Sequence, residues 1–319
     1  MTTSKSPRRV FQVAYEAARR ALPAHGHKFS PKKFTQPQLM ACLVLKEFLR
    51  LDYRGFAEHL ADHPDLARLI GLKAVPHFTT FQKAAARLLV AAPARATFDA
   101  VLRRALKEKV RKRRVPLAAV DGTGLESRHV SRYYVKRRSK TGGGAQETTH
   151  SRYPKVVLVT DCHSHLVLAA APGRGPASDL VLFEAALRQA AGRARIGTLL
   201  ADADFDGEWV HEHVREVYGI RTLIPPTRGR PSDKPPAGRW RRWMKAQLGR
   251  FKAKYGQRWQ TETVNSMIKR RLGSALRART YWSQCREIIL RVITHNVMIV
   301  AKIRVFYRAD DSAFQPTRQ

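Results

Sequence analysis

Acidic residues are scarce in this chain. Its 319 residues include 25 Asp and Glu against 60 Lys and Arg, so the formal net charge is +35 at pH 7. A genome rich in arginine codons would add Arg but would not remove acids. An enzyme for small neutral metabolites has no need of this excess, whereas a polyanion is held by many phosphate contacts that release counterions. We therefore expect a nucleic-acid partner and no small-molecule substrate.

Cysteines and long apolar runs are also few. The three cysteines, Cys42, Cys162 and Cys285, are far apart, which excludes a disulfide framework and a CxxC metal site. A reducing cytoplasm fits this usage. The first twenty residues lack the apolar segment of a signal peptide, and no run of about 18 apolar residues exists. We expect a cytoplasmic protein with no membrane partner.

The pattern of the chain predicts a helical first part and an α/β second part. Residues 1–34 are polar and basic and predict a flexible arm that can hold a short helix. Residues 35–114 have short helical segments joined by tight turns, which is typical of a helix-turn-helix DNA-binding region and nearly as typical of a plain helical bundle. Residues 115–306 form the α/β domain, with a basic linker or insertion at 227–254, and residues 307–319 form a C-terminal tail.

Short apolar runs mark the strands of the α/β domain. After PLAAV comes a basic loop, RYYVKRRSKTGGG, and then a hairpin made by KVVLVTD and HLVLAAAPG. Helical segments then alternate with the strands GTLLADA and IRTLIPP. This order predicts a mixed five-stranded sheet flanked by helices.

Two Asp residues follow neighbouring strands of this sheet. Asp121 ends PLAAV, and Asp202 ends TLLA. Ligands of α/β sheets gather beyond the carboxyl ends of strands, and a buried acid there is costly unless it is paired or metal-bound. The two carboxylates could share a divalent ion, although each Asp could simply cap the turn that follows.

A third carboxylate, Glu262, lies on a predicted helix. At 100° per residue, Tyr255, Arg258, Glu262 and Lys269 fall on one stripe about 60° wide. Surface pairing of Arg258 with Glu262 is the simpler explanation of this stripe. Together with the two strand-end acids, however, Glu262 could hold two Mg²⁺ ions for an in-line phosphoryl displacement, while Arg258 and Lys269 bind phosphates.

These residues resemble bacterial insertion-sequence DDE transposases. The string YGQRWQTETVNSMIK matches the Y-(2)-R-(3)-E-(6)-K signature of that family at every spacing, and AVDGTGLE and LLADADFDG are similar to its motifs around the first and second Asp. The second motif points to Asp202 rather than Asp204 or Asp206, and it has Phe205 where the family more often has Tyr. The resemblance covers roughly residues 35–305.

The resemblance implies a ribonuclease H-like catalytic domain. It implies that Asp121, Asp202 and Glu262 are the catalytic metal ligands for two Mg²⁺ ions, with Mn²⁺ as a possible substitute. It further implies an enzyme that cleaves double-stranded DNA at the inverted repeats of the element and joins these ends to target DNA. A homodimer in the DNA complex and a place at the bacterial nucleoid follow from the same analogy.

The basic linker and the signature helix supply the expected DNA contacts. In RWRRWMK, the two Trp side chains could stack on unpaired bases, or they could simply pin the linker to the core. The residues that we expect to contact DNA are Tyr255, Arg258, Lys269, Arg270, Trp240, Trp243, Arg241 and Arg242.

Two other functions remain open at this point. A stand-alone metal-dependent DNA endonuclease of the same fold would cut without joining, and a DNA-binding protein without chemistry would do neither. Asp161 and Glu126 are rival carboxylates, but Asp161 begins the hairpin turn and is expected at the far end of the sheet.

Overall fold

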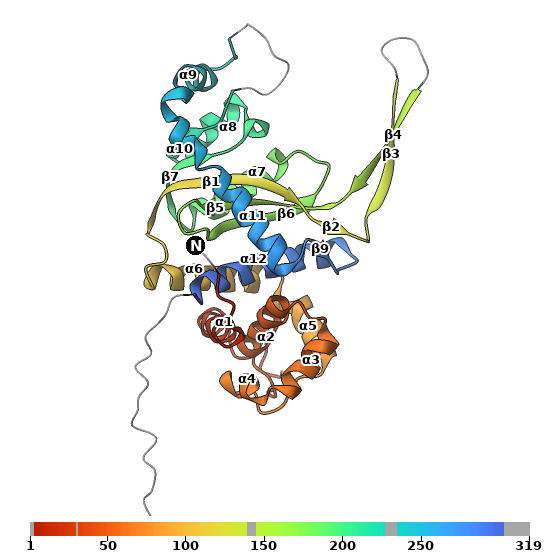
Figure 1. The fold of residues 1–319 in the computed structure, drawn as a ribbon. Coiled ribbons are helices and arrows are strands. Elements are labelled where there is room, and N and C mark those ends of the chain that lie inside the picture. The colour runs from red at the N-terminus through yellow and green to blue at the C-terminus, as the bar shows by residue number, and fades with distance from the viewer. Residues whose placement is uncertain (1–2, 30, 139–144, 227–234, 303–319) are drawn as a thin grey trace, which may run out of the picture.

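The computed structural model describes residues 3–29, 31–138, 145–226 and 235–302. Helices make up the first region of the chain, as Figure 1 shows. They are α1 (Pro7–Ala21), α2 (Gln36–Leu49), α3 (Tyr53–Asp62), α4 (Pro64–Leu69), α5 (Phe78–Leu88) and α6 (Ala91–Lys107). The sequence specifies several of these starts, because Thr35 forms a capping box with Gln38 and the Asp52 side chain accepts a hydrogen bond from the Gly55 amide.

The central sheet has the strand order β6-β5-β1-β7-β8. β5 runs antiparallel to both β1 and β6, whereas β1, β7 and β8 run parallel to one another. The mixed five-stranded sheet and the ribonuclease H-like fold predicted from the sequence are thereby confirmed. The strands are β1 (Arg114–Gly124), β5 (Pro154–Asp161), β6 (Val167–Arg174), β7 (Arg195–Leu200) and β8 (Arg221–Leu223).

Helices cover both faces of this sheet. One face packs against α7 (Leu180–Ala191) and α8 (Glu208–Glu212), which continues as a π-helical turn to Val217. The other face packs against α11 (Trp259–Leu272) and α12 (Tyr281–Val300). Smaller elements complete the domain: β2 (Glu126–Ser127), β9 (Ala275–Leu276), α9 (Arg239–Gln247), α10 (Lys252–Gly256) and 3-10 turns at Ala203–Phe205 and Leu248–Phe251.

The basic segment after β1 is not the loop that its composition suggested. Strands β3 (Ser131–Arg138) and β4 (Ala145–Arg152) pair in antiparallel register from Ser131 opposite Arg152 to Arg138 opposite Ala145. Figure 1 shows this two-stranded ribbon projecting away from the central sheet. The polar sequence hid the strands because it lacks the alternation of apolar and polar residues that predicts a strand.

The expectation of a flexible arm over residues 1–34 is wrong for the stretch that forms α1. Val10 and Phe11 are fully buried, and α1 packs against α2, α6 and α12. Apolar residues recur at helical spacing along α1, and the arginines between them concealed this stripe. The expected tail at 307–319 and linker residues 227–234 lie outside the described residues.

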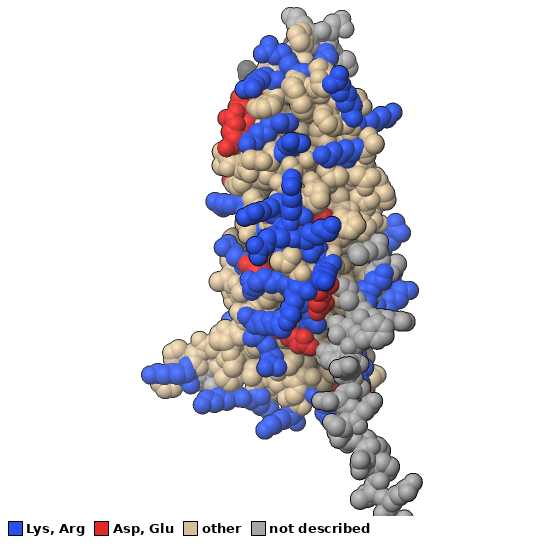
Figure 2. All heavy atoms as spheres, turned by 90° about the vertical axis from the view of Figure 1, so that its left-hand side faces the viewer, with Lys and Arg blue, Asp and Glu red and all other residues tan. Residues whose placement is uncertain are grey.

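The excess of cations lies on the surface of the molecule. The side at the left of Figure 1 faces the viewer in Figure 2, where lysine and arginine side chains crowd along the middle of the face and acidic side chains are few. No helix of the described residues has both the length and the apolar character needed to cross a bilayer.

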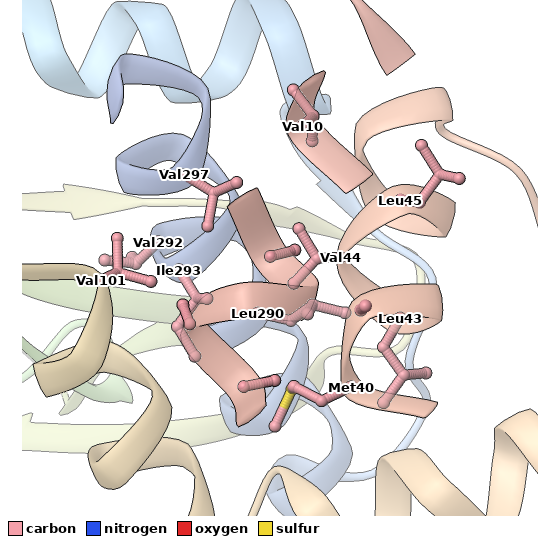
Figure 3. Packing of buried hydrophobic residues seen from close by; sticks show 14 of the residues in the cluster. Val10, Met40, Leu43, Val44, Leu45, Val101, Leu290, Val292, Ile293 and Val297 are labelled. Atoms are coloured by element: carbon pink, nitrogen blue, oxygen red, sulfur yellow. The ribbon is translucent and has the colours of Figure 1, made fainter. Parts of the chain in front are cut away.

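One hydrophobic core joins the helical region to the second face of the sheet. Figure 3 shows side chains from α1, α2, α6 and α12 packed together, among them Val10, Val44, Val101 and Ile293. The same cluster reaches Leu158 of β5. The helical region therefore shares a core with the sheet domain and is not a separate domain. It packs against α12 and holds this helix against the sheet.

Candidate active site

The register of the central sheet brings Asp121 and Asp202 to one level and one face. Ala119 of β1 lies beside Leu200 of β7 in the last parallel pair of these strands, and each Asp lies two residues beyond its member of that pair. Residues two apart in extended backbone point to the same side. Both carboxylates therefore emerge on the side where Ala119 and Leu200 pack against Met244 of α9.

Asp121 lies within β1 rather than at its end, because pairing with β5 continues to Gly124. Its Oδ2 accepts a hydrogen bond of 2.9 Å from Nδ2 of Asn265. Asn265 is on α11, three residues after Glu262, so it follows Glu262 by almost one helical turn. The sequence analysis missed Asn265, because its contact with Asp121 joins residues far apart in the chain and no local pattern encodes it.

Asp202 also caps the short turn that follows it. Its Oδ1 accepts a hydrogen bond of 3.0 Å from the Asp204 amide, so the turn-capping role that was open from the sequence is present here. Burial raises the pKa of Asp202, and the Asp204 carboxylate raises it further, while that amide and the Arg258 guanidinium lower it. Asp204 itself is exposed, and the Asp206 side chain is buried in an ion pair with Arg241.

Glu262 lies in the first turn of α11 beside Arg258. The Arg258 Nη2 and the Glu262 Oε1 form an ion pair of 2.6 Å, and the Glu262 side chain is 54% exposed. The surface pairing that the spacing allowed is therefore present. Burial raises the pKa of Tyr255, which Arg258 lowers and Asp202 raises, so Tyr255 also lies within the field of this cluster.

The three carboxylates act on one another electrostatically. Burial raises the pKa of Asp121 to about 6, with further increases from Asp202 and Glu262, while Arg258 lowers it. Among the described residues, however, no three acidic, histidine or cysteine side chains lie close enough together to hold a metal ion. The structure brings the acids into one neighbourhood, with Glu262 held by Arg258.

The donor chemistry of this neighbourhood fits a hard divalent cation. Asp121, Asp202 and Glu262 offer carboxylate oxygens, which are the preferred ligands of Mg²⁺. In addition, the Asn265 Oδ1 is buried and has no hydrogen-bond partner among the described residues. A buried acceptor without a donor is costly, and a cation would satisfy it.

Gly122, the residue after Asp121, is in a place that has no room for a side chain. A Cβ at this position would lie 2.1 Å from Oδ2 of Asp179. Asp179 forms an ion pair of 2.5 Å with Lys155 and raises the pKa of Asp202. Gly122 therefore leaves space for Asp179 next to the Asp121 backbone. Asp179 is a further acid near the site that the sequence analysis did not identify.

Comparison with known proteins adds a family assignment to this geometry. The family model of the transposase DDE domain matches residues 114–297, more than half of the chain. The chain belongs to the family of DDE-domain transposases. Searches of curated proteins and of solved structures found no match. The resemblance to insertion-sequence DDE transposases is thus confirmed, and the matched residues include the three carboxylates and the whole signature helix.

The outer face of α11 in this transposase is open to solvent. Arg270 is exposed there, as expected, and so is Trp259, whose side chain the sequence analysis did not consider. Lys269 is half-buried and lies about 10 Å along the helix from Glu262. The residues of this face are Trp259, Glu262, Thr263, Ser266, Met267, Arg270 and Arg271.

The start of α9 is fixed to the transposase core. The Glu208 carboxylate accepts hydrogen bonds from the amides of Trp240 and Arg241, at 2.7 and 3.0 Å. The Arg241 guanidinium donates two hydrogen bonds, of 2.8 and 2.7 Å, to the buried Asp206. Because its guanidinium is committed to this internal contact, Arg241 is not expected to bind DNA.

The two tryptophans of α9 pack around one cation. The Arg215 guanidinium lies 4.1 Å from the ring centre of Trp240 and 5.1 Å from that of Trp243. Trp243 still keeps 38% of its surface exposed, and Arg242 is exposed beside it. The pinning role that was open from the sequence is therefore present, and Trp243 and Arg242 retain surface for another partner.

The rival carboxylates lie elsewhere. Asp161 is opposite Ala118, three residues before Asp121 along β1, and accepts hydrogen bonds from the Ser164 hydroxyl and the His163 amide. Glu126 lies on β2, which pairs with β9.

Proposed function

We propose that this transposase binds the ends of an insertion element as double-stranded DNA, cuts there, and joins the ends to target DNA by in-line phosphoryl transfer. The observation that carries the proposal is the register of β1 and β7, which supports the placement of Asp121 and Asp202 side by side on one face of the sheet. Glu262 is close enough to raise the pKa of Asp121. A family of transposases acts on DNA, and a charge of +35 suits that substrate.

Asp121, Asp202 and Glu262 are the residues that would hold the metal. Two Mg²⁺ ions, or Mn²⁺ in their place, would supply activation of the attacking oxygen and stabilisation of the leaving oxygen. Asn265 holds the Asp121 carboxylate through one amide atom and leaves its own oxygen free beside it. Its contribution is to fix the direction of the Asp121 carboxylate.

Arg258 links DNA binding to the completion of the site. In the free protein its guanidinium neutralises Glu262. A DNA phosphate would offer Arg258 a second anion. If the Arg258 side chain paired with that phosphate instead of with Glu262, the Glu262 carboxylate would be free to bind the metal. Tyr255, Lys269 and Arg270 lie on or next to α11 and would position the same strand.

The rest of the DNA contact area is divided between two regions. Trp240, Trp243 and Arg242 on α9 would meet the strand beside the site, with the exposed Trp243 stacking on a base. The helical region over 35–114 would grip the duplex further away. We propose a homodimer in the DNA complex, acting at the nucleoid in the bacterial cytoplasm.

A joining assay tests this proposal. The donor is the chromosomal reading frame amplified with its natural flanks, the target is a supercoiled plasmid, and the reaction contains Mg²⁺ or Mn²⁺. Sequenced junctions between a defined donor end and plasmid DNA are the expected product. Loss of several kcal/mol of transition-state stabilisation predicts a decrease of roughly 10³-fold for Glu262→Gln.

Matched variants separate the alternatives. Glu126→Gln removes a nearby carboxylate outside the site and should join normally. Nicked plasmid without junctions would indicate a stand-alone nuclease of the same fold. Full joining by Glu262→Gln would refute the assignment of the site, and unchanged DNA binding without any product in the wild type would favour a non-catalytic DNA-binding protein.

A further inference from the structure

A second cluster of cations lies at the edge of the sheet where β1 and β7 begin. We define this basic edge by its exposed residues, which come from the end of α6, the following loop and the first residues of the two strands. They are Lys107, Lys109, Lys112, Arg113, Arg114 and Arg195. This edge is at the left of Figure 1 and belongs to the face crowded with basic side chains in Figure 2.

Two arginines of the basic edge stand side by side on adjacent strands. Arg114 and Arg195 are direct partners in the parallel register of β1 and β7, and Arg195 also donates its amide to the Arg113 carbonyl. Adjacent strands are about 4.8 Å apart. Two cations whose backbones are this close are held within reach of one anion, so the arrangement favours a bound anion.

In the described part of the chain, the charge of the basic edge is not paired with acidic side chains. None of the six cations is within ion-pair distance of a carboxylate in the described part of the chain. The acids of the neighbouring helices have other partners, because Asp99 pairs with Arg193, and Glu16 and Glu108 both pair with Arg104. The basic edge therefore presents its full charge to the solvent.

The loop that carries the basic edge is fixed to the core. The buried Arg111 donates hydrogen bonds of 3.2 Å to the carbonyls of Leu102 and Arg193, and Val110 is buried beside it. These contacts tie α6, the loop and the start of β7 into one surface. A preorganised surface loses less conformational entropy on binding than separate mobile lysines would.

The basic edge is distinct from the carboxylate site. Arg114 and Asp121 are seven residues apart on β1, which corresponds to about 23 Å of strand. A duplex advances 3.4 Å per base pair, so the same distance spans about seven base pairs. One duplex that leaves the site could reach the edge, and so could a second duplex.

We propose that the basic edge binds the phosphate backbone of duplex DNA outside the segment that is cut. This inference rests on the proposed function in taking DNA as the substrate, and it narrows the grip proposed for residues 35–114 to their last residues together with Arg195. The bound phosphates come either from the continuation of the element end or from a separate target duplex, and both offer the same chemistry to the arginines.

Binding of a fluorescent 40-base-pair duplex, measured by anisotropy over a range of KCl concentrations, tests the inference. The edge variant combines Arg113→Gln, Arg114→Gln and Arg195→Gln. Each lost phosphate contact lowers the slope of log Kd against log [KCl] by about 0.9, so we expect a decrease of about 2 to 3 and at least a roughly 10-fold weaker Kd near physiological salt.

The matched control removes the same charge from another surface. It combines Lys28→Gln, Lys32→Gln and Lys33→Gln, which are exposed on the connection between α1 and α2. We expect its Kd to change less than about threefold. Equal losses in the two variants would overturn the inference. The three substituted side chains are exposed, so the edge variant should melt close to the wild type, and a thermal melt checks that it folds.

Tethered cleavage identifies the source of the bound DNA. An iron chelate is attached to Arg195→Cys in a Cys285→Ser background, since Cys42 and Cys162 are buried. Cuts about seven base pairs from the cleavage position in the element end support a continuous duplex, and cuts in a separately labelled target support a second one. Cuts in neither DNA would overturn the inference.

The two proposals fail in different ways. The edge variant keeps all three carboxylates, and Glu262→Gln keeps the edge. Normal joining by Glu262→Gln with weak binding by the edge variant would refute the active site alone, whereas the reverse pattern would refute the edge alone.

Discussion

Replacing Asp121 with Asn should stabilise the protein in the absence of metal. The carboxylate is largely buried, and the charges of Asp202 and Glu262 act on it. An Asn side chain has nearly the same shape and can still accept the hydrogen bond from Asn265. The substitution therefore removes a repulsive charge while it leaves the packing and this contact in place, so the free energy of unfolding should rise.

The size and sign of the effect follow from the pKa of Asp121. Folding raises this pKa from 3.8 to about 6, a difference of about two units. At 1.36 kcal/mol per unit, the charged carboxylate costs the folded state at most about 3 kcal/mol. Between these two pKa values the folded state binds more protons than the unfolded state, so wild-type stability falls as the pH rises through this window. The variant lacks this dependence.

Urea unfolding in EDTA from pH 4 to pH 8 measures the difference. We expect the two proteins to be nearly equal at pH 4, with the Asp121→Asn variant more stable by about 1 to 3 kcal/mol above pH 6. Asp161→Asn is the control, because Asp161 accepts hydrogen bonds from the Ser164 hydroxyl and the His163 amide and should lose stability when changed. A variant less stable than the wild type at pH 7.5, or a difference independent of pH, would refute the reasoning.

Two further predictions concern the packing around the site. Gly122→Ala should lower the free energy of unfolding by about 2 kcal/mol or more, because its Cβ meets Asp179 at 2.1 Å, and thermal unfolding will show no decrease if that contact is wrong. Arg241→Ala leaves Asp206 buried without its partner and should cost about 3 to 5 kcal/mol, whereas the exposed Arg242→Ala should stay within about 0.5 kcal/mol; equal effects in urea unfolding would contradict this assignment.

The sequence allowed the sheet to be predicted because its strands are continuous apolar runs. Such runs are required where helices bury both faces, and all of β5 is buried here. The β3–β4 ribbon has a polar and basic sequence, which carries no comparable signal. The packing of α1 was missed for another reason. This helix does have an apolar stripe, but arginines that point outwards interrupt it in the sequence.

The candidate site could be predicted in part. Asp121 and Asp202 stand out because acids after apolar strands are rare, and Glu262 stands out through its spacing from Arg258. The contact of Asn265 with Asp121 joins residues 144 positions apart, and no local pattern encodes it. The same holds for Asp179, which the fold brings against Gly122 from the start of another helix.

The carboxylates of the candidate site destabilise the free protein and would favour its complex with metal and DNA. Burial, Asp202 and Glu262 raise the pKa of Asp121, and the Arg258 guanidinium, which lowers it, is paired with Glu262. Burial raises the energy of these charges, and in the described part of the chain Arg258 is the cation that pairs with one of the three acids. In the proposed complex, divalent ions would neutralise the acids, and a DNA phosphate bound by Arg258 would release Glu262. The same interactions that destabilise the free protein thus favour the complex in which cleavage would take place.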